Sequence, residues 1–146
     1  MTDTVTDTNV HLIAPVIALV FWSMLICAWA VATRVSAIKR SGMKLDPAAP
    51  RGEQMALLPA RVRWKADNYN NLMEQPTLFY AVALSLAVLG DHAMISLWLA
   101  WTYVGLRVVH SLVQTTVNRI AIRFGLFALS SLVLLALTCR ALMIVL

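Results

Sequence analysis

Four long and nearly uninterrupted apolar stretches constrain the fold of this chain more than any other feature. They cover residues 12–33, 72–89, 93–113 and 122–145. A helix needs roughly 20 mostly apolar residues to cross about 30 Å of hydrocarbon, and each stretch is close to that length. Their continuous apolar character differs from the period-two alternation of a membrane β-strand. The sequence therefore predicts an all-α membrane protein that folds as a bundle of four transmembrane helices.

Composition and linkers agree with a single membrane domain over residues 1–146. Of the 146 residues, 60% are hydrophobic and only 13% are charged, whereas a soluble domain carries about 25% charged residues. Glycine, proline and charge cluster in the linker "SGMKLDPAAPRGEQ", residues 41–54, and no internal repeat is visible. Because Pro59 suits the start of a helix, we expect the second helix to begin near residue 59, outside the membrane.

Charged residues are distributed unevenly along the chain and predict its orientation. The segment before the first stretch contains Asp3 and Asp7 but no Lys or Arg, whereas residues 34–65 hold most of the chain's 12 lysines and arginines. Basic loops stay in the cytoplasm, so both termini are predicted to lie outside. A cleaved secretory signal begins with a basic segment, and the absence of Lys and Arg before the first apolar stretch argues against one here. The basic cytoplasmic loops account for the net charge of +5. The charge therefore gives no reason to expect a nucleic-acid partner.

The two cysteines, Cys27 and Cys139, fall within the first and last predicted helices. Because a helix rises about 1.5 Å per residue, they lie at different membrane depths, too far apart for a disulfide. Their spacing is not typical of metal ligands. We therefore predict packing roles for both cysteines and no metal site.

Polar residues form two stripes on the middle pair of predicted helices. In the second helix, Asp67, Asn71 and Glu74 are spaced i, i+4 and i+7, so they share one face. A carboxylate near the hydrocarbon edge is costly unless it is paired, which predicts a cation beside Glu74. The third helix carries a stripe of Tyr103, Arg107, His110 and Gln114. We predict one polar cluster made up of Asn71, Glu74, Arg107 and His110.

Some of these residues also have simpler interpretations. Arg119 and Arg123, one turn apart near the start of the last helix, could anchor that helix at the cytoplasmic surface. Arg107 could extend its side chain to the lipid head groups. Tyr103 and Gln114 are of types that often serve as interfacial or packing residues.

Taken in order along the chain, these segments resemble the MAPEG family, the membrane-associated proteins in eicosanoid and glutathione metabolism. The resemblance rests on "RVRWKADNYNNLMEQP" entering the second helix, "GLRVVH" in the third and "NRIAIR" entering the fourth. Its most specific element is Asn71-x-x-Glu74, followed by Arg107-x-x-His110 and then by Arg123. The first helix matches only by position. Within the family, the chain is most similar to the small bacterial members.

The resemblance implies a homotrimer in a bacterial inner membrane, with a glutathione site between neighbouring subunits that opens toward the cytoplasm. By the family pattern, Arg123 would be the catalytic residue that stabilises the glutathione thiolate. A nearby guanidinium favours the charged form of a thiol, and arginines grip carboxylates with two parallel hydrogen bonds. The residues expected to bind the substrate are Asn71, Glu74, Arg107, His110 and Arg119.

The implied function is a glutathione-dependent transferase or peroxidase that acts on lipophilic electrophiles. The chain departs from the family pattern at Asp67, where the better-known enzymes usually have an arginine. Gln114 and Phe127 stand where some members have tyrosines. These departures leave a second class open, a non-catalytic scaffold that serves as a lipid-binding or accessory subunit of a larger membrane complex. The expected partners are other copies of the chain, membrane lipids and, for the enzyme, a lipophilic small molecule.

Overall fold

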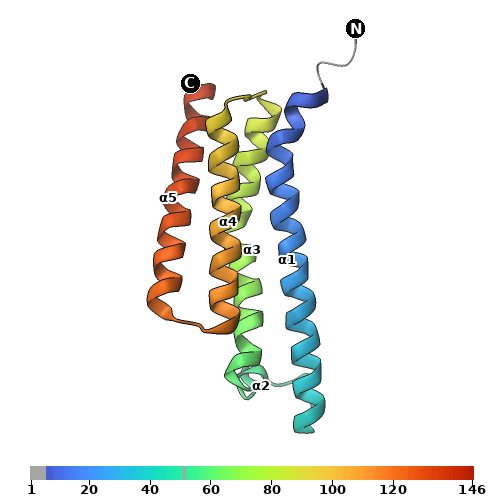
Figure 1. Ribbon diagram of the computed structural model, residues 1–146. Coiled ribbons are helices and arrows are strands. Elements are labelled where there is room, and N and C mark those ends of the chain that lie inside the picture. The colour runs from blue at the N-terminus through green and yellow to red at the C-terminus, as the bar shows by residue number, and fades with distance from the viewer. Residues whose placement is uncertain (1–5, 51) are drawn as a thin grey trace.

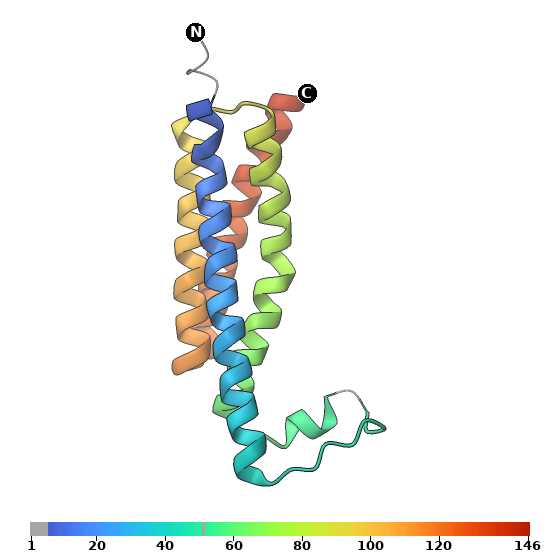
Figure 2. The ribbon, with the colours of Figure 1, turned by 90° about the vertical axis from the view of Figure 1, so that its right-hand side faces the viewer.

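The structure, a computed structural model, describes residues 6–50 and 52–146, and these residues form helices and connecting loops without a β-strand. Four long helices stand side by side and run alternately up and down, while a short helix lies in the loop between the first two (Figures 1 and 2). The helices are α1 Thr6–Ser41, α2 Glu53–Ala56, α3 Ala60–Val88, α4 Met94–Thr116 and α5 Ile120–Val145. The predicted all-α fold is confirmed.

The helix boundaries follow the apolar stretches closely. Each predicted span lies within one long helix, apart from the last residue of the second span, Leu89, and the first residue of the third span, Ala93. Helix α3 begins at Ala60 with Pro59 as its N-cap residue, close to the predicted start. Two segments, His11–Ser41 and Ile120–Val145, are long and apolar enough to cross a membrane by length and composition. Helices α3 and α4, which carry the polar stripes, do not meet this criterion.

The bundle is apolar both inside and outside. Its core is formed by fully buried side chains such as Leu19, Phe79 and Leu137, and the Phe79 ring stacks on Tyr103 with 4.6 Å between the ring centroids. Large apolar side chains also cover the outer surface of every long helix. Examples that are more than half exposed are Phe21, Leu78, Trp98 and Leu132. An apolar exterior of this kind is suited to lipid rather than to water.

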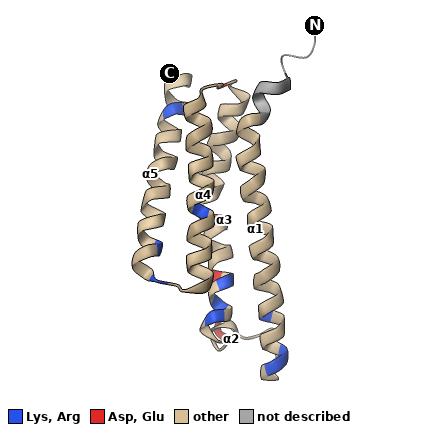
Figure 3. Cartoon of the chain, in the orientation of Figure 1, with Lys and Arg blue, Asp and Glu red and all other residues tan. Residues whose placement is uncertain are grey.

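Lysines and arginines gather at one end of the bundle. Figure 3 shows them near the end of α1, the start of α3 and the start of α5, at the end opposite to the start of α1. Helix α1 begins, and helix α5 ends, at the less basic end (Figure 1). Asp3 and Arg51, which entered the prediction of orientation, lie outside the described residues, as does the side chain of Asp7.

At the less basic end, an ion pair ties the turn between α3 and α4 to α5. Arg140 Nη2 donates to Asp91 Oδ1 at 3.1 Å, and the Asp91 carboxylate also accepts hydrogen bonds from the Ser96 hydroxyl and the Ala93 amide. Burial alone would raise the pKa of Asp91, but the hydrogen bonds from Arg140, Ser96 and Ala93 outweigh it and lower that pKa below its ordinary value. The ionised carboxylate therefore stabilises the turn.

Acid should weaken this turn. Because the pKa of Asp91 is lower in the folded state than the unfolded value of about 3.9, its stabilisation is complete above that pH. The stabilisation is lost as the pH falls through the folded pKa. Asp91→Asn should therefore lower the thermal unfolding midpoint at pH 7 and flatten its dependence on pH in the acid range. Circular dichroism melts at a series of pH values test this. Equal loss in Glu53→Gln, which changes an exposed carboxylate on α2, would contradict it.

Candidate functional site

The arginine of the α4 stripe lies at the meeting point of three helices. Arg107 is fully buried, and its Nη2 donates to both the main-chain oxygen and Oδ1 of Asn71 on α3, each at 2.8 Å. From α5, the Phe127 ring lies with its centroid 5.9 Å from Arg107 Cζ. The Nε and Nη1 atoms of Arg107 have no hydrogen-bond partner within the described part of the chain. The interpretation that Arg107 reaches the head groups is therefore wrong.

An open groove with a volume of about 400 Å³ lies beside this arginine. Its lining residues are Asn71, His110, Ile120, Arg123, Phe124 and Phe127. At one edge, Arg123 Nη1 donates to Asn118 Oδ1 at 2.6 Å, while the buried Arg123 Nε has no partner among the described residues. The wall includes the nearly buried His110 from α4. The structure thus brings Asn71, His110 and Arg123 together around one groove, with Arg107 behind Asn71.

Two of the predicted site residues lie away from the groove. Glu74 is exposed, and the only ion pair among the described side chains, those of residues 11–50 and 52–146, joins Asp91 to Arg140. The predicted pairing of Glu74 with Arg107 is therefore not formed within one chain; pairing across subunits stays a prediction. The physical reason is that α3 buries a different face, which contains Asn68, Leu72, Pro76 and Phe79. Arg119 is exposed at the N-cap of α5 and is not among the groove's lining residues.

Asn68 and Gln75, two polar residues of α3 that were not among the predicted site residues, form hydrogen bonds to neighbouring helices. Asn68 is fully buried on α3, where its Nδ2 donates to Gln114 Oε1 at 2.9 Å and its Oδ1 accepts from Ser111 Oγ at 2.8 Å. Gln75 Nε2 donates to Ser131 Oγ on α5 at 2.7 Å. Asn68 and Gln75 are two helical turns apart and so share a face, which their spacing could have indicated. Gln114 therefore has a packing role.

Removal of the Asn68 side chain should loosen α3 from α4. Asn68→Ala leaves the buried Gln114 and Ser111 side chains without partners, which costs on the order of 1–3 kcal/mol for each unsatisfied group. We therefore expect a clear drop in the thermal unfolding midpoint. Asn70→Ala changes an exposed amide two residues away and should have little effect. If both variants unfolded at the wild-type temperature, the amide would not join the helices.

A second and more polar cavity, of about 460 Å³, lies where α1, α2 and α3 meet at the basic end. Its lining includes Arg34, Arg63, Asp67 and Asn70. Asp67, which stands where the family pattern usually has an arginine, therefore shares its cavity with two arginines. Arg34 entered the sequence analysis only as a marker of orientation, because it lies on a helix that the resemblance matched by position alone.

Comparison with known proteins supports the family resemblance. The MAPEG family model matches residues 12–143, nearly the whole chain. Neither a curated protein nor a solved structure matches the chain. The matched range contains every residue of the groove and the greater part of all four long helices. MAPEG is a membrane family, in agreement with the apolar exterior and with the two long apolar segments in α1 and α5. The chain belongs to the MAPEG family.

Proposed function

We propose that this protein is a membrane-bound, glutathione-dependent transferase or peroxidase that acts on lipophilic electrophiles. The observation that carries the proposal is the buried Arg107 guanidinium, which has two nitrogens without partners among the described residues and lies behind a groove lined by Asn71, His110 and Arg123. A buried cation without a counter-charge is unfavourable, so an anionic ligand would stabilise this arrangement. Glutathione carries two carboxylates, and arginine side chains bind carboxylates strongly.

The two arginines differ in burial, which suits them to different tasks. Arg107 is fully buried and held by Asn71, so it would bind and orient an anionic group of the ligand. Arg123 is partly exposed at the groove edge, where it would favour the ionised form of the glutathione thiol. The thiolate is the nucleophile that such an enzyme supplies to its electrophile. Arg119, exposed outside the groove, would act only through its screened charge.

The polar cavity beside α2 contains cations that would compensate for Asp67, a carboxylate where the family pattern usually has an arginine. Arg34 and Arg63 line that cavity together with Asp67. Arg34 directly follows the apolar stretch of α1, and Arg63 lies nine residues before that of α3. In this proposal they bind the second carboxylate of glutathione in place of the arginine usual at the Asp67 position. Asp67 itself lowers the affinity because it faces the same cavity with a like charge.

We also propose that the chain assembles as a homotrimer, with the groove covered by a neighbouring subunit. The groove is open within one chain, and its rim carries Ile120 and Phe124, which are 79% and 71% exposed. Apolar rim residues favour burial against another apolar surface. Glu74 is exposed on α3, where it could meet a cation of the neighbouring subunit or the ammonium group of glutathione.

Calorimetric titration of the purified protein with reduced glutathione tests the proposal. Wild type should bind at millimolar concentration or below. Asp67→Arg should bind more tightly because the substitution removes the like charge and adds a cation. The matched control, Asp46→Arg, makes the same change in an exposed loop and should leave the affinity unchanged. If neither wild type nor Asp67→Arg bound glutathione, the enzyme proposal would fail.

One observation favours a second candidate, a non-catalytic scaffold that binds lipids or serves as an accessory subunit of a larger membrane complex. The Phe127 ring lies over the Arg107 guanidinium and has no hydroxyl group to offer to a thiol. The same titration separates the two functions, because a scaffold has no need to bind glutathione. Phe127→Tyr would restore a hydroxyl at the groove wall, and a gain in rate with a model electrophile would count against the scaffold.

We further propose that all four long helices cross a bacterial inner membrane with both termini outside. The gathering of lysines and arginines at one end of the bundle supports this orientation (Figure 3). In a background without Cys27 and Cys139, a membrane-impermeant thiol reagent should label His92→Cys from outside. It should reach Leu45→Cys and Val117→Cys only after the membrane is opened. All three positions are exposed, so the labelling reports on sidedness. Labelling of Leu45→Cys in intact cells would show that the orientation is opposite to the one proposed.

A further inference from the structure

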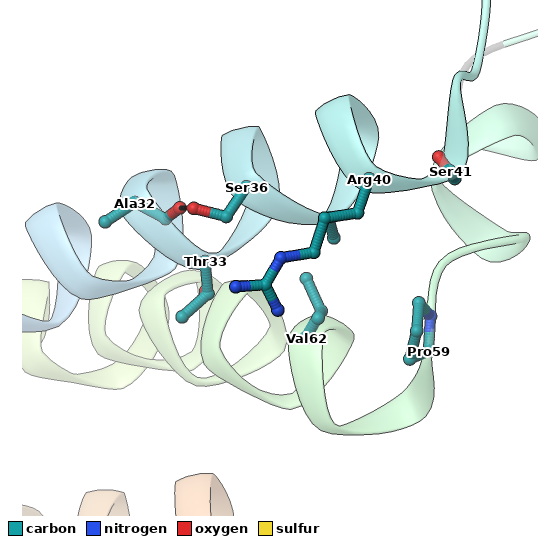
Figure 4. Close-up of a pocket in the computed structure, with 8 residues that line it drawn as sticks. Ala32, Thr33, Ser36, Arg40, Ser41, Pro59 and Val62 are labelled. Carbon is teal, nitrogen blue, oxygen red and sulfur yellow. Dashed lines mark hydrogen bonds between the residues drawn. The ribbon is translucent and has the colours of Figure 1, made fainter.

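A mainly apolar groove with a volume of about 610 Å³ separates the end of α1 from the start of α3. Its walls include Ala32, Ala37, Pro59 and Val62 (Figure 4). The volume falls within the range of roughly 300–1,000 Å³ that is usual for small-molecule sites. This groove is separate from the groove that is lined from α3, α4 and α5. It borders the polar cavity that holds Arg34 and Arg63, with which it shares Val62, but Arg40 does not line that cavity.

One cation is placed over this groove. Figure 4 shows the Arg40 side chain extending back along α1 toward Thr33 and Val62. Arg40 forms no ion pair with any residue that the structure describes. The hydroxyls of Thr33 and Ser36 already donate to carbonyl oxygens of their own helix, at 2.8 Å in both cases. The Arg40 guanidinium is therefore the polar group best placed to bind an anion at this groove.

With residues 12–33 taken as the membrane span of α1, the groove falls at the depth of the lipid head groups. The first apolar stretch ends near Thr33, and Arg40 follows seven residues later, about 10 Å further along the helix. Because helical side chains tilt toward the helix N-terminus, the guanidinium lies nearer to the membrane than its own Cα atom. The head-group layer adds about 5–8 Å on each side of the hydrocarbon, so the guanidinium reaches this layer while Ala32 and Thr33 border the acyl chains.

We propose that this groove binds an anionic phospholipid, with the head-group phosphate on Arg40 and part of an acyl chain against Ala32, Ala37 and Val62. Basic pockets between helices on the cytoplasmic side of a membrane bind anionic head groups by this combination of charge and apolar wall. Neutral phospholipids lack the net negative charge that a lone arginine selects. The proposal does not depend on glutathione chemistry, since Arg40 lines neither of the two cavities assigned to glutathione.

Native mass spectrometry of the full-length protein in neutral detergent tests the proposal. The probes are phosphatidylglycerol and phosphatidylcholine with identical acyl chains. Wild type should retain phosphatidylglycerol in preference to phosphatidylcholine. Arg40→Gln should reduce that preference by about five-fold or more, the effect of one cation at an anionic lipid surface. The matched control is Lys39→Gln, which removes the same charge from the adjacent exposed residue outside the groove, and it should keep the wild-type preference.

A second variant tests the apolar part of the groove. Ser36→Phe fills the groove from an exposed position without a change of charge, and it should reduce retention of phosphatidylglycerol as Arg40→Gln does. Soluble glycerol phosphate should compete poorly because it has no acyl chain. Equal losses of phosphatidylglycerol preference in Arg40→Gln and Lys39→Gln would mean that the lipid responds to the overall basic charge and not to this groove. Full retention of phosphatidylglycerol in Ser36→Phe would mean that only the head-group anion is bound and that the apolar wall plays no part. Cross-linking between two copies through Ser36→Cys would mean that another subunit covers the groove. Each of these three results would overturn the proposal.

Discussion

Arg107→Met should abolish glutathione binding and leave the subunit at least as stable as wild type. Loss of a buried cation from a binding site costs about 2–5 kcal/mol of binding energy, or roughly 30- to 4,000-fold in affinity, which places a millimolar ligand beyond detection. The fold itself gains, because the wild-type guanidinium is fully buried and two of its nitrogens have no partner within the described chain. Replacing a buried charged group by an apolar one of similar size is often neutral or stabilising.

This combination distinguishes a functional arginine from a structural one. If Arg107 served mainly to join α4 to α3 through Asn71, the methionine variant would unfold at a clearly lower temperature. Calorimetry with glutathione and thermal melts of the same preparations measure both properties. Arg61→Met is the matched control, since it makes the same substitution at an exposed position at the start of α3. It should leave both binding and stability close to wild type.

Arg123→Ala should lower the rate with a model electrophile by on the order of 100-fold, while glutathione affinity stays within a few-fold of wild type. Removal of one group that stabilises a developing or reacting anion typically lowers the rate by about 100-fold or more. Binding is spread over several charges in this proposal, whereas thiol activation is local to Arg123. Arg123→Lys should recover only part of the rate, because an ammonium does not reproduce the planar guanidinium.

Lys44→Ala removes one cation from the exposed loop at the same end of the bundle and serves as the control for this series. It should retain the wild-type rate. A parallel fall of affinity and rate in Arg123→Ala would assign Arg123 to binding alone. An unchanged rate would remove it from the mechanism and leave it as an N-terminal anchor of α5 that is joined to Asn118.

The sequence predicts the helices well because each one is a long apolar stretch between polar breaks. Helix α3 begins within one residue of the predicted position. Proline has no backbone amide hydrogen to donate, so it is tolerated at the start of a helix but not in its interior. The stripe that contains Arg107 and His110 also predicts the buried face of α4, where both side chains are buried. On this helix the polar residues are few enough that their common face and the buried face coincide.

Helix α3 shows why the rest of the site is harder to predict. Consecutive residues of a helix are separated by about 100° around its axis, so Asp67 and Asn68 point in different directions. The sequence analysis followed the stripe of Asp67, Asn71 and Glu74, whereas the structure buries Asn68 and exposes Asp67 and Glu74. A helix rich in polar residues does not specify its own rotation. That rotation depends on partners such as Ser111 and Gln114, which lie more than 40 residues away in sequence.

Whether the groove binds glutathione and ionises its thiol can be measured by the ultraviolet absorbance of the thiolate as reduced glutathione is added to the wild-type protein at neutral pH. It reports binding and thiol activation at the same site in one experiment. We expect a signal that saturates with glutathione. It should be lost in Arg107→Met, because the ligand no longer binds, and reduced in Arg123→Ala, although the ligand still binds. A folded wild-type protein that shows no thiolate signal at millimolar glutathione would contradict the account.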